Sequence, residues 1–143
     1  MKVIVKNKRG LHNYVIEKKY EAGISLLGSE VKSIRNSDVI FSNSSYIFIE
    51  KGEVYLSGLE IKEYASANIL NHDPKRVKKL LLNSKEIKRI SEYVNVKGLT
   101  VVPVMIYFNS KSLIKVEIAV ARGVKKYDKR EKEKEKNFKK GLL

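Results

Sequence analysis

Apolar and polar residues alternate along much of the chain, which predicts a protein built mainly of strands. The clearest stretch is residues 113–121, where every second position from Ile114 to Val120 is apolar and Lys115 and Glu117 lie between. A period of two places these apolar side chains on one face of a strand that buries that face. The same pattern, with enrichment in β-branched and aromatic residues, predicts strands at residues 12–20, 45–50, 53–57, 59–64 and 99–108.

Turn signals separate several of these strands. Lys51-Gly52 is a two-residue connection with glycine where a hairpin turn needs a positive φ. The polar segment from Asn109 to Ser112 turns the chain from the strand at 99–108 into the next one. Pro103 lies inside the first of these two strands, where it has no N–H to donate, so we expect a bulge or a free edge there.

A short helix is expected after the first strand. Leu27, Val31 and Ile34 are spaced i, i+4 and i+7, which is one face of a helix. Gly28 or Ser29 is expected to cap its start. The polar residues expected to point away from the apolar stripe are Glu30, Lys32, Ser33 and Arg35.

Two further helix starts are predicted. His72 precedes Asp73-Pro74, and Asp73 as N-cap with proline at the first helical position is a common way to begin a helix. Asn83 followed by Glu86 three residues later forms a capping box, in which each side chain bonds the other's backbone N–H. Gly98 is expected to close this second helix.

Half a dozen short strands with interspersed short helices favour a closed or nearly closed antiparallel barrel. The chain has 143 residues, which suits one domain with a single core. We therefore expect a mainly β fold in which residues 1–121 form the barrel. Residues 122–143 would form a separate basic tail.

The predicted tail is the most strongly basic part of the chain. It carries a net charge of +6, which leaves +8 on residues 1–121 out of a total of +14. A segment with so few apolar side chains does not offset its own ordering entropy, so we expect it to be disordered when free and to order against a polyanion. Within it, Lys125 to Arg130 places Tyr127 and Asp128 among four cations, and an aromatic ring there can stack on a base.

Several function classes find little support. The chain has no cysteine, so it forms no disulfide or thiolate site, and His12 and His72 lack the spacing of paired metal ligands. No apolar stretch approaches the ~20 residues of a membrane-spanning helix. Nucleophile elbows, phosphate-binding loops and dinucleotide fingerprints are missing from the sequence. His72 beside Asp73 fits a helix start better than a catalytic pair. We expect no metal site, and a cytoplasmic protein fits the absence of cysteine. A nuclease or RNA-modification enzyme whose site no motif reveals stays open as an alternative.

A set of short motifs then follows one family's order along almost the whole chain. The chain resembles the SsrA-binding proteins (small protein B) from about Asn7 to Lys136. Each motif alone is weak, and their combination in this order is specific. The motifs are Asn7-Lys8-Arg9 with His12, Tyr20-Glu21-Ala22-Gly23, the segment Gly28 to Arg35, the segment from Asp73-Pro74 through Lys79-Leu80-Leu81-Leu82, Lys97-Gly98-Leu99-Thr100, Lys115-Val116-Glu117, Ala121-Arg122-Gly123 and Asp128-Lys129-Arg130.

The resemblance implies an oligonucleotide-binding (OB)-like barrel that binds the transfer-RNA-like domain of tmRNA and brings it to stalled ribosomes for trans-translation. Its partners would be tmRNA and the small ribosomal subunit with its ribosomal RNA, and the protein would act as a monomer. The resemblance also implies that the protein is not an enzyme and needs no cofactor. The tail would order along the messenger channel. The implied tail contacts are Lys125, Tyr127, Asp128, Lys129 and Arg130.

The resemblance also implies a set of tmRNA contacts in the barrel. Glu21 is unusual among them, because phosphate repels a carboxylate, so it would accept from a base or orient cations; alternatively it pairs with Lys18 or Lys19. Leu81 either packs on an unstacked base or lies in the core. The matching positions are Asn7, Glu21, Leu81 and Lys115, to which the motif cations Lys8, Arg9, Lys32 and Arg122 are added.

Two other functions are compatible with the composition. One is a structural ribosomal or ribosome-assembly protein whose basic tail is buried in ribosomal RNA. The other is a general single-strand RNA-binding OB domain, which needs a strip of exposed aromatic side chains. Tyr14, Tyr20, Tyr46 and Tyr55 could supply such a strip or lie in the core.

Overall fold

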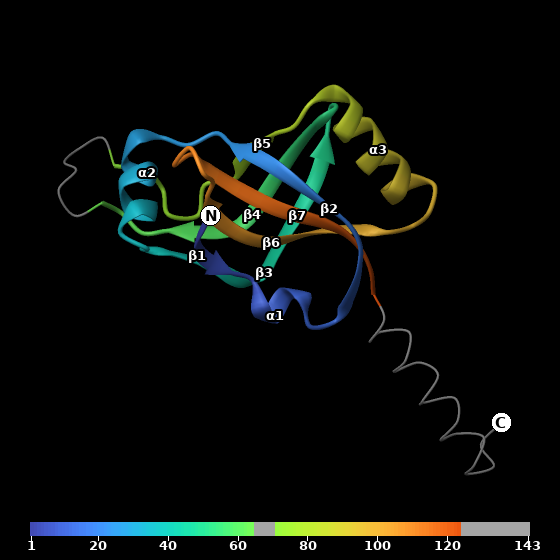
Figure 1. Cartoon of the computed structure of the whole chain (residues 1–143), viewed down its shortest axis with the longest axis horizontal. Helices are drawn as coiled ribbons and strands as arrows, with labels where there is room; N and C mark the ends of the chain where they lie inside the picture. Colours follow the sequence, from blue (N-terminus) through green and yellow to red (C-terminus); the bar gives the residue numbers. More distant parts are fainter. Residues whose placement is uncertain (65–70, 124–143) are drawn as a thin grey trace, which may run out of the picture.

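The computed structural model describes residues 1–64 and 71–123. Within these ranges the chain forms a seven-stranded antiparallel sheet with three short helices outside it (Figure 1). The tail residues 124–143, including the predicted contacts Lys125 to Arg130, lie outside the described residues. In chain order the elements are β1 (Lys2–Lys6), α1 (Lys8–Leu11), β2 (Tyr14–Ile24), α2 (Gly28–Arg35), β3 (Val39–Glu50), β4 (Glu53–Ile61), β5 (Lys78–Leu81), α3 (Ser84–Asn95), β6 (Thr100–Phe108) and β7 (Ile114–Gly123).

The sheet curls into a nearly closed barrel, which confirms the predicted mainly β fold. Its strand order is β1-β6-β7-β2-β5-β4-β3, and the first strand, β1, also contacts the last, β3. Four pairings shift register, at β1–β6, β2–β7, β3–β4 and β6–β7. Such shifts increase local twist and bend, which is how a sheet of this size closes on itself. The shift beside Pro103 is the irregularity that the sequence predicted.

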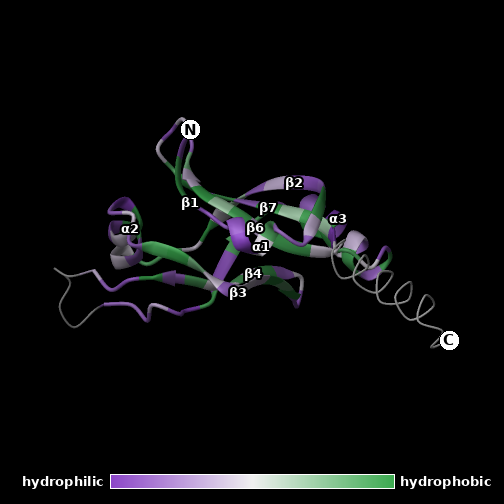
Figure 2. Ribbon diagram, turned by 90° about the horizontal axis from the view of Figure 1, so that it is seen from below, coloured by the Kyte–Doolittle hydropathy of each residue, from purple (hydrophilic) through white to green (hydrophobic). Residues whose placement is uncertain are grey.

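The core fills the barrel and confirms the predicted alternation in β7. Val116, Ile118 and Val120 are buried there with side chains from every other strand except β1, which contributes partly buried residues. A second, smaller cluster lies on the outer face of β6 and β7, where Ala119 and Ala121 pack beneath α1 and Leu11. In Figure 2 the largely hydrophilic α1 lies beside the apolar β6. The outward face of β7 is therefore partly covered by α1 and is not fully exposed to solvent.

Local turn chemistry is also confirmed. Lys51 and Gly52 have φ of 51° and 76°, the two positive values of a type I′ hairpin turn. Asn83 accepts from the Glu86 N–H at 2.8 Å and Glu86 accepts from the Asn83 N–H at 3.1 Å, completing the capping box of α3. Gly98 has a φ of 66° just beyond the end of that helix.

The helix predicted from Asp73 is wrong. Asp73 accepts from the Lys75 N–H, but only a turn follows, and the chain enters β5 at Lys78. Pro74 accepts from the Ile61 N–H, so the segment is bound to the end of β4 instead of coiling. The strand predicted at 59–64 is not separate either, because β4 continues through Gly58, whose φ is 88°.

The prediction for α2 placed its start and its polar face wrongly. Leu27, not Gly28 or Ser29, is the N-cap, and its N–H donates to Glu30 at 2.7 Å. Glu30 and Ser33 are buried, whereas Leu27 is 48% exposed. The reason is a partner distant in sequence: Arg76 reaches Glu30 from the segment before β5. The sequence analysis also missed the short elements β1 and α1.

Lys78 is fully buried and donates to the Leu59 carbonyl at 2.6 Å. Burial lowers its pKa to about 8, although Glu30 partly opposes that shift. Between pH 8 and 9.5 the unfolded chain keeps the Lys78 proton while the folded protein releases it. We therefore expect the free energy of unfolding to rise by about 1–2 kcal/mol over this interval. Urea unfolding across this range tests the rise, and Lys78→Met should flatten it; an equal rise in the variant would contradict the assignment.

Candidate nucleic-acid interface

The register of the sheet brings three of the predicted RNA contacts, Glu21, Leu81 and Lys115, onto one face. Residues paired across antiparallel strands project to the same side. One row joins Met105, Glu117 and Glu21, and the next joins Tyr107, Lys115 and Gly23, with Leu81 opposite Gly23. We call this surface, the outward side of β6, β7, β2 and β5, the outer face.

Glu21 is exposed, and its carboxylate accepts a hydrogen bond from the hydroxyl of Tyr107. Burial, together with this bond to a carboxylate, raises the pKa of Tyr107 well above its ordinary value. Among the described residues Glu21 forms no ion pair with Lys18 or Lys19, which was the alternative. Lys19 Nζ instead lies 3.4 Å from Glu117, and Lys18 Nζ lies over the Tyr20 ring. Glu21 is thus fixed by Tyr107 and presented at the surface.

A groove of about 350 Å³ runs beside Gly23, Leu81 and Lys115. Leu81 is 52% exposed, so the alternative that it lies in the core is excluded. A Cβ at Gly23 would lie 3.1 Å from the Leu81 Cβ, so the glycine keeps this part of the groove open. The groove therefore joins an apolar wall to a cation. Its other lining residues are Ile24, Leu26, Val31, Arg35, Ser112, Leu113 and Ile114.

Asn7 does not present a free amide. It is 4% exposed, its Nδ2 donates to the Pro103 carbonyl at 2.8 Å, and its Oδ1 accepts from the Gly10 N–H at 3.2 Å. Its donor and acceptor are thus used within the protein, where they hold α1 against β6. The consequence is that Lys8 and Arg9 are exposed on α1, beside the outer face.

The other two motif cations lie apart from this face. Lys32 is exposed on α2, with its Nζ 5.3 Å from the centre of the Tyr64 ring. Arg122 lies near the end of β7, and its Nη2 is 3.7 Å from Glu17 Oε1. Both are solvent-exposed side chains, so these ion and cation–π contacts contribute little stability.

The sequence analysis missed Tyr107 as part of the interface. Tyr107 lies in a nearly continuous apolar run and is itself buried, so no local pattern marks it. Its position follows only from the hairpin register that pairs it with Lys115. Arg35, which the sequence analysis treated only as a polar helix residue, lines the groove beside Leu81.

The described residues show no cluster that could hold a metal ion. Within 1–64 and 71–123 no three His, Cys, Asp or Glu side chains gather as metal ligands. His72 is buried and bridges the Ser29 hydroxyl and the Ile61 carbonyl, each at 2.8 Å. It therefore ties α2 to β4, and it is neither the start of a helix nor part of a catalytic pair with Asp73. No helix in this part of the chain is long and apolar enough to cross a membrane.

A nearly closed antiparallel barrel with exposed cations and a groove on one face defines the class of OB-like nucleic-acid-binding proteins. The family model described as "SmpB protein" matches residues 4–142. The chain belongs to the SmpB family, which confirms the resemblance found from its motifs.

Individual relatives agree. The SsrA-binding protein of Thermosipho melanesiensis is 51% identical over 131 residues, covering 92% of this chain and 88% of the relative. That of Fervidobacterium nodosum is 47% identical over 142 residues, covering 99% and 95%. A solved structure described as "tmRNA-SmpB: a journey to the center of the bacterial ribosome" superimposes with a TM-score of 0.66 at 46% identity and covers 82% of each chain.

Proposed function

We propose that this protein binds the transfer-RNA-like domain of tmRNA through its outer face and delivers it to stalled ribosomes for trans-translation. The observation that carries this is that Glu21, Leu81 and Lys115 share the outer face, where Leu81 and Lys115 line one groove. The relatives are named as SsrA-binding proteins, and the structural neighbour is described as a tmRNA complex of the bacterial ribosome. Such an adaptor acts in the cytoplasm and requires neither catalysis nor a cofactor.

Each residue has a chemical task in this proposal. Lys115 and the α1 cations Lys8 and Arg9 contact phosphates, which position the RNA. Leu81 and the apolar groove wall receive an unstacked base, as is usual when a protein recognises an RNA loop. Glu21, held by Tyr107, accepts from base amino or imino groups. Asn7 acts indirectly, because its side chain fixes α1.

A general single-strand-binding function has one observation in its favour. Tyr46, Phe48 and Tyr55 form a strip on β3 and β4, with ring centres 5.8 and 5.2 Å apart, and Tyr46 is 53% exposed. Base stacking on such a strip tolerates any sequence. Tyr20, by contrast, belongs to the core. This second candidate predicts equal affinity for tmRNA and for unrelated RNA.

Titrations of both RNAs at matched salt separate the two candidates. We expect the transfer-RNA-like domain to bind far more tightly than an unrelated RNA of equal length. Lys115→Ala should weaken tmRNA binding by roughly tenfold and reduce the log–log salt slope by about 1, because one phosphate contact is lost. Lys111→Ala, which removes an exposed cation from the neighbouring turn, is the matched control and should change affinity less than about twofold. Superimposed titrations of the two RNAs would establish the general binder instead.

A further inference from the structure

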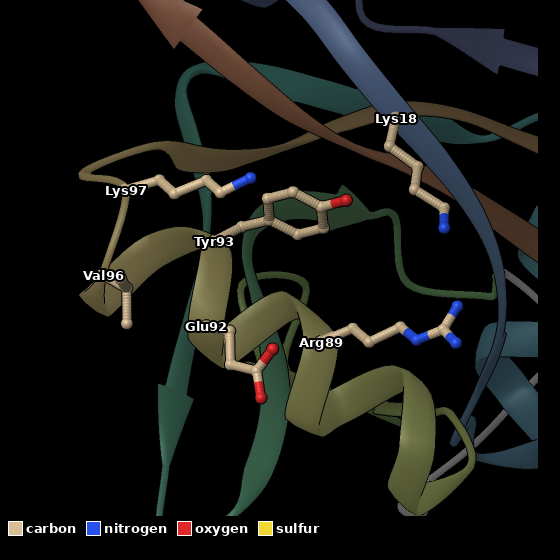
Figure 3. Close-up of a pocket in the computed structure, with 6 residues that line it drawn as sticks. All are labelled: Lys18, Arg89, Glu92, Tyr93, Val96 and Lys97. Carbon is tan, nitrogen blue, oxygen red and sulfur yellow. The ribbon is translucent and has the colours of Figure 1, made fainter.

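A cationic hollow, distinct from the groove on the outer face, lies between β2 and α3. It has a volume of about 530 Å³ and we call it the α3 hollow (Figure 3). None of its residues belongs to the set predicted to contact tmRNA. The side chains that line it are Lys18, Arg89, Glu92, Tyr93, Val96 and Lys97.

The charge around the α3 hollow is strongly unbalanced. Among the ion pairs of residues 1–64 and 71–123, none involves Lys18, Arg89 or Lys97. Glu92 is the one acid in the lining, and in Figure 3 its carboxylate points away from Lys18 and from the Arg89 guanidinium. Three cations that share a concave site with one acid leave a net positive charge, which creates a potential that favours an anion.

The polar ends of three side chains converge there. In Figure 3 the ammonium group of Lys18, the guanidinium of Arg89 and the hydroxyl of Tyr93 point toward the same space, from β2 and from α3. Contacts with rings hold two of the cations: Lys18 Nζ lies 5.3 Å from the centre of the Tyr20 ring and Lys97 Nζ lies 5.2 Å from that of Tyr93. Of the three converging donors, Lys18 is thus partly preorganised, which lowers the entropy lost on binding.

The sheet register places this hollow away from the outer face. Lys18 is opposite Val120 on β7, and Val120 is a core residue inside the barrel. Lys19 and Glu21 are opposite Ala119 and Glu117, on the other side of the same strand. Because successive residues of a strand project to opposite faces, an RNA segment lying on the outer face does not also enter the α3 hollow.

We propose that the α3 hollow binds a backbone phosphate of a second RNA segment. Lys18 and Arg89 supply the positive charge, and the guanidinium fork together with the Tyr93 hydroxyl donates to the phosphate oxygens. The segment belongs either to ribosomal RNA or to a part of tmRNA outside the transfer-RNA-like domain. This site goes beyond the proposed function, whose contacts lie on the outer face, and gives the barrel two RNA-binding sides.

The test uses the full-length protein with the Lys18→Ala/Arg89→Ala double change. Lys88→Ala is the control, because Lys88 is exposed on α3 and does not line the hollow. Three probes are titrated against each protein: purified small ribosomal subunits, full-length tmRNA, and the isolated transfer-RNA-like domain. We expect the double change to weaken binding to the subunits or to full-length tmRNA by roughly tenfold and to reduce the salt slope by about 1–2. Binding to the isolated domain and the thermal midpoint should stay unchanged.

Which probe is affected identifies the RNA. A loss confined to the subunits assigns the phosphate to ribosomal RNA, and a loss confined to full-length tmRNA assigns it to tmRNA. Wild-type binding to both probes would overturn the proposal, as would an equal loss in Lys88→Ala. Should the double variant unfold, Arg89→Gln and Tyr93→Phe replace it, and both must weaken the same probe. The isolated transfer-RNA-like domain distinguishes this proposal from the proposed function. If the proposed function failed, Lys115→Ala would no longer weaken binding to that domain. The comparison of the double variant with Lys88→Ala on the other two probes would still stand.

Discussion

Replacing Arg76 by methionine is expected to lower the free energy of unfolding by about 3–5 kcal/mol, because it leaves a buried carboxylate without its partner. Glu30 is fully buried, with Oε1 2.5 Å from Arg76 Nη2 and Oε2 3.1 Å from Arg76 Nε. Burial alone would raise the pKa of Glu30. The hydrogen bonds from Arg76 and from the Leu27 N–H outweigh that effect, so its pKa is lowered. Urea unfolding at neutral pH measures the loss.

Two further variants sharpen this measurement. Arg35→Met removes an exposed cation from α2 and should cost less than about 1 kcal/mol. Glu30→Gln combined with Arg76→Met should recover part of the loss, because no buried charge remains. The lowered pKa of Glu30 stabilises the folded protein at pH values above the pKa of this group in the unfolded chain. The wild-type protein should therefore lose this stability as the pH falls through the acid range. A loss below about 1 kcal/mol in Arg76→Met would contradict the role given to this pair.

Ending the chain at Gly123 is expected to abolish trans-translation, and with it the tagging of stalled proteins on the ribosome. The affinity for the transfer-RNA-like domain should stay within about twofold of the full-length value. The reason is a division of labour: the outer face lies wholly within the described barrel, whereas residues 124–143 carry most of the basic segment. The cut belongs after Gly123, not after Ala121, because β7 continues to Gly123 and pairs it with Tyr14. A trans-translation assay and an RNA titration measure the two activities separately.

Point changes in the tail provide the matched comparison. Asp128→Ala raises the net charge, so a tail that acts by charge alone should work at least as well with it. We expect instead that Asp128→Ala and Tyr127→Ala both reduce tagging and leave tmRNA binding unchanged. Lys139→Ala, near the end of the chain, should have little effect. Normal tagging by the protein that ends at Gly123 would contradict the division between barrel and tail.

The family and the broad fold were accessible from the sequence because their signals are local. The hairpin at Lys51-Gly52 depends on two residues and the cap of α3 on Asn83 and Glu86, so neighbours in sequence suffice. The period of two in β7 shows directly which of its side chains enter the core. Ordered motifs along the chain then indicated the family before any contact was known.

Local signals failed where a distant partner decided the outcome. The Asp73-Pro74 start has good helix chemistry, yet Pro74 is bound to Ile61 and the chain enters β5 instead. Glu30 looks like a solvent-facing helix residue, yet Arg76, 46 positions away, draws it into the interior. In both cases tertiary contacts outweigh a propensity of at most about 1 kcal/mol per residue for residues other than proline.

By itself the sequence determined a basic, mainly β chain, because composition, periodicity and turn chemistry are properties of short segments, and its ordered motifs indicated the SmpB family. Only the tertiary structure decided how the site is built. The sheet register brings Tyr107 to Glu21 and opens the groove between Leu81 and Lys115, and barrel closure separates that face from the α3 hollow. Register and closure depend on pairings between residues far apart in the chain, and no local pattern encodes them.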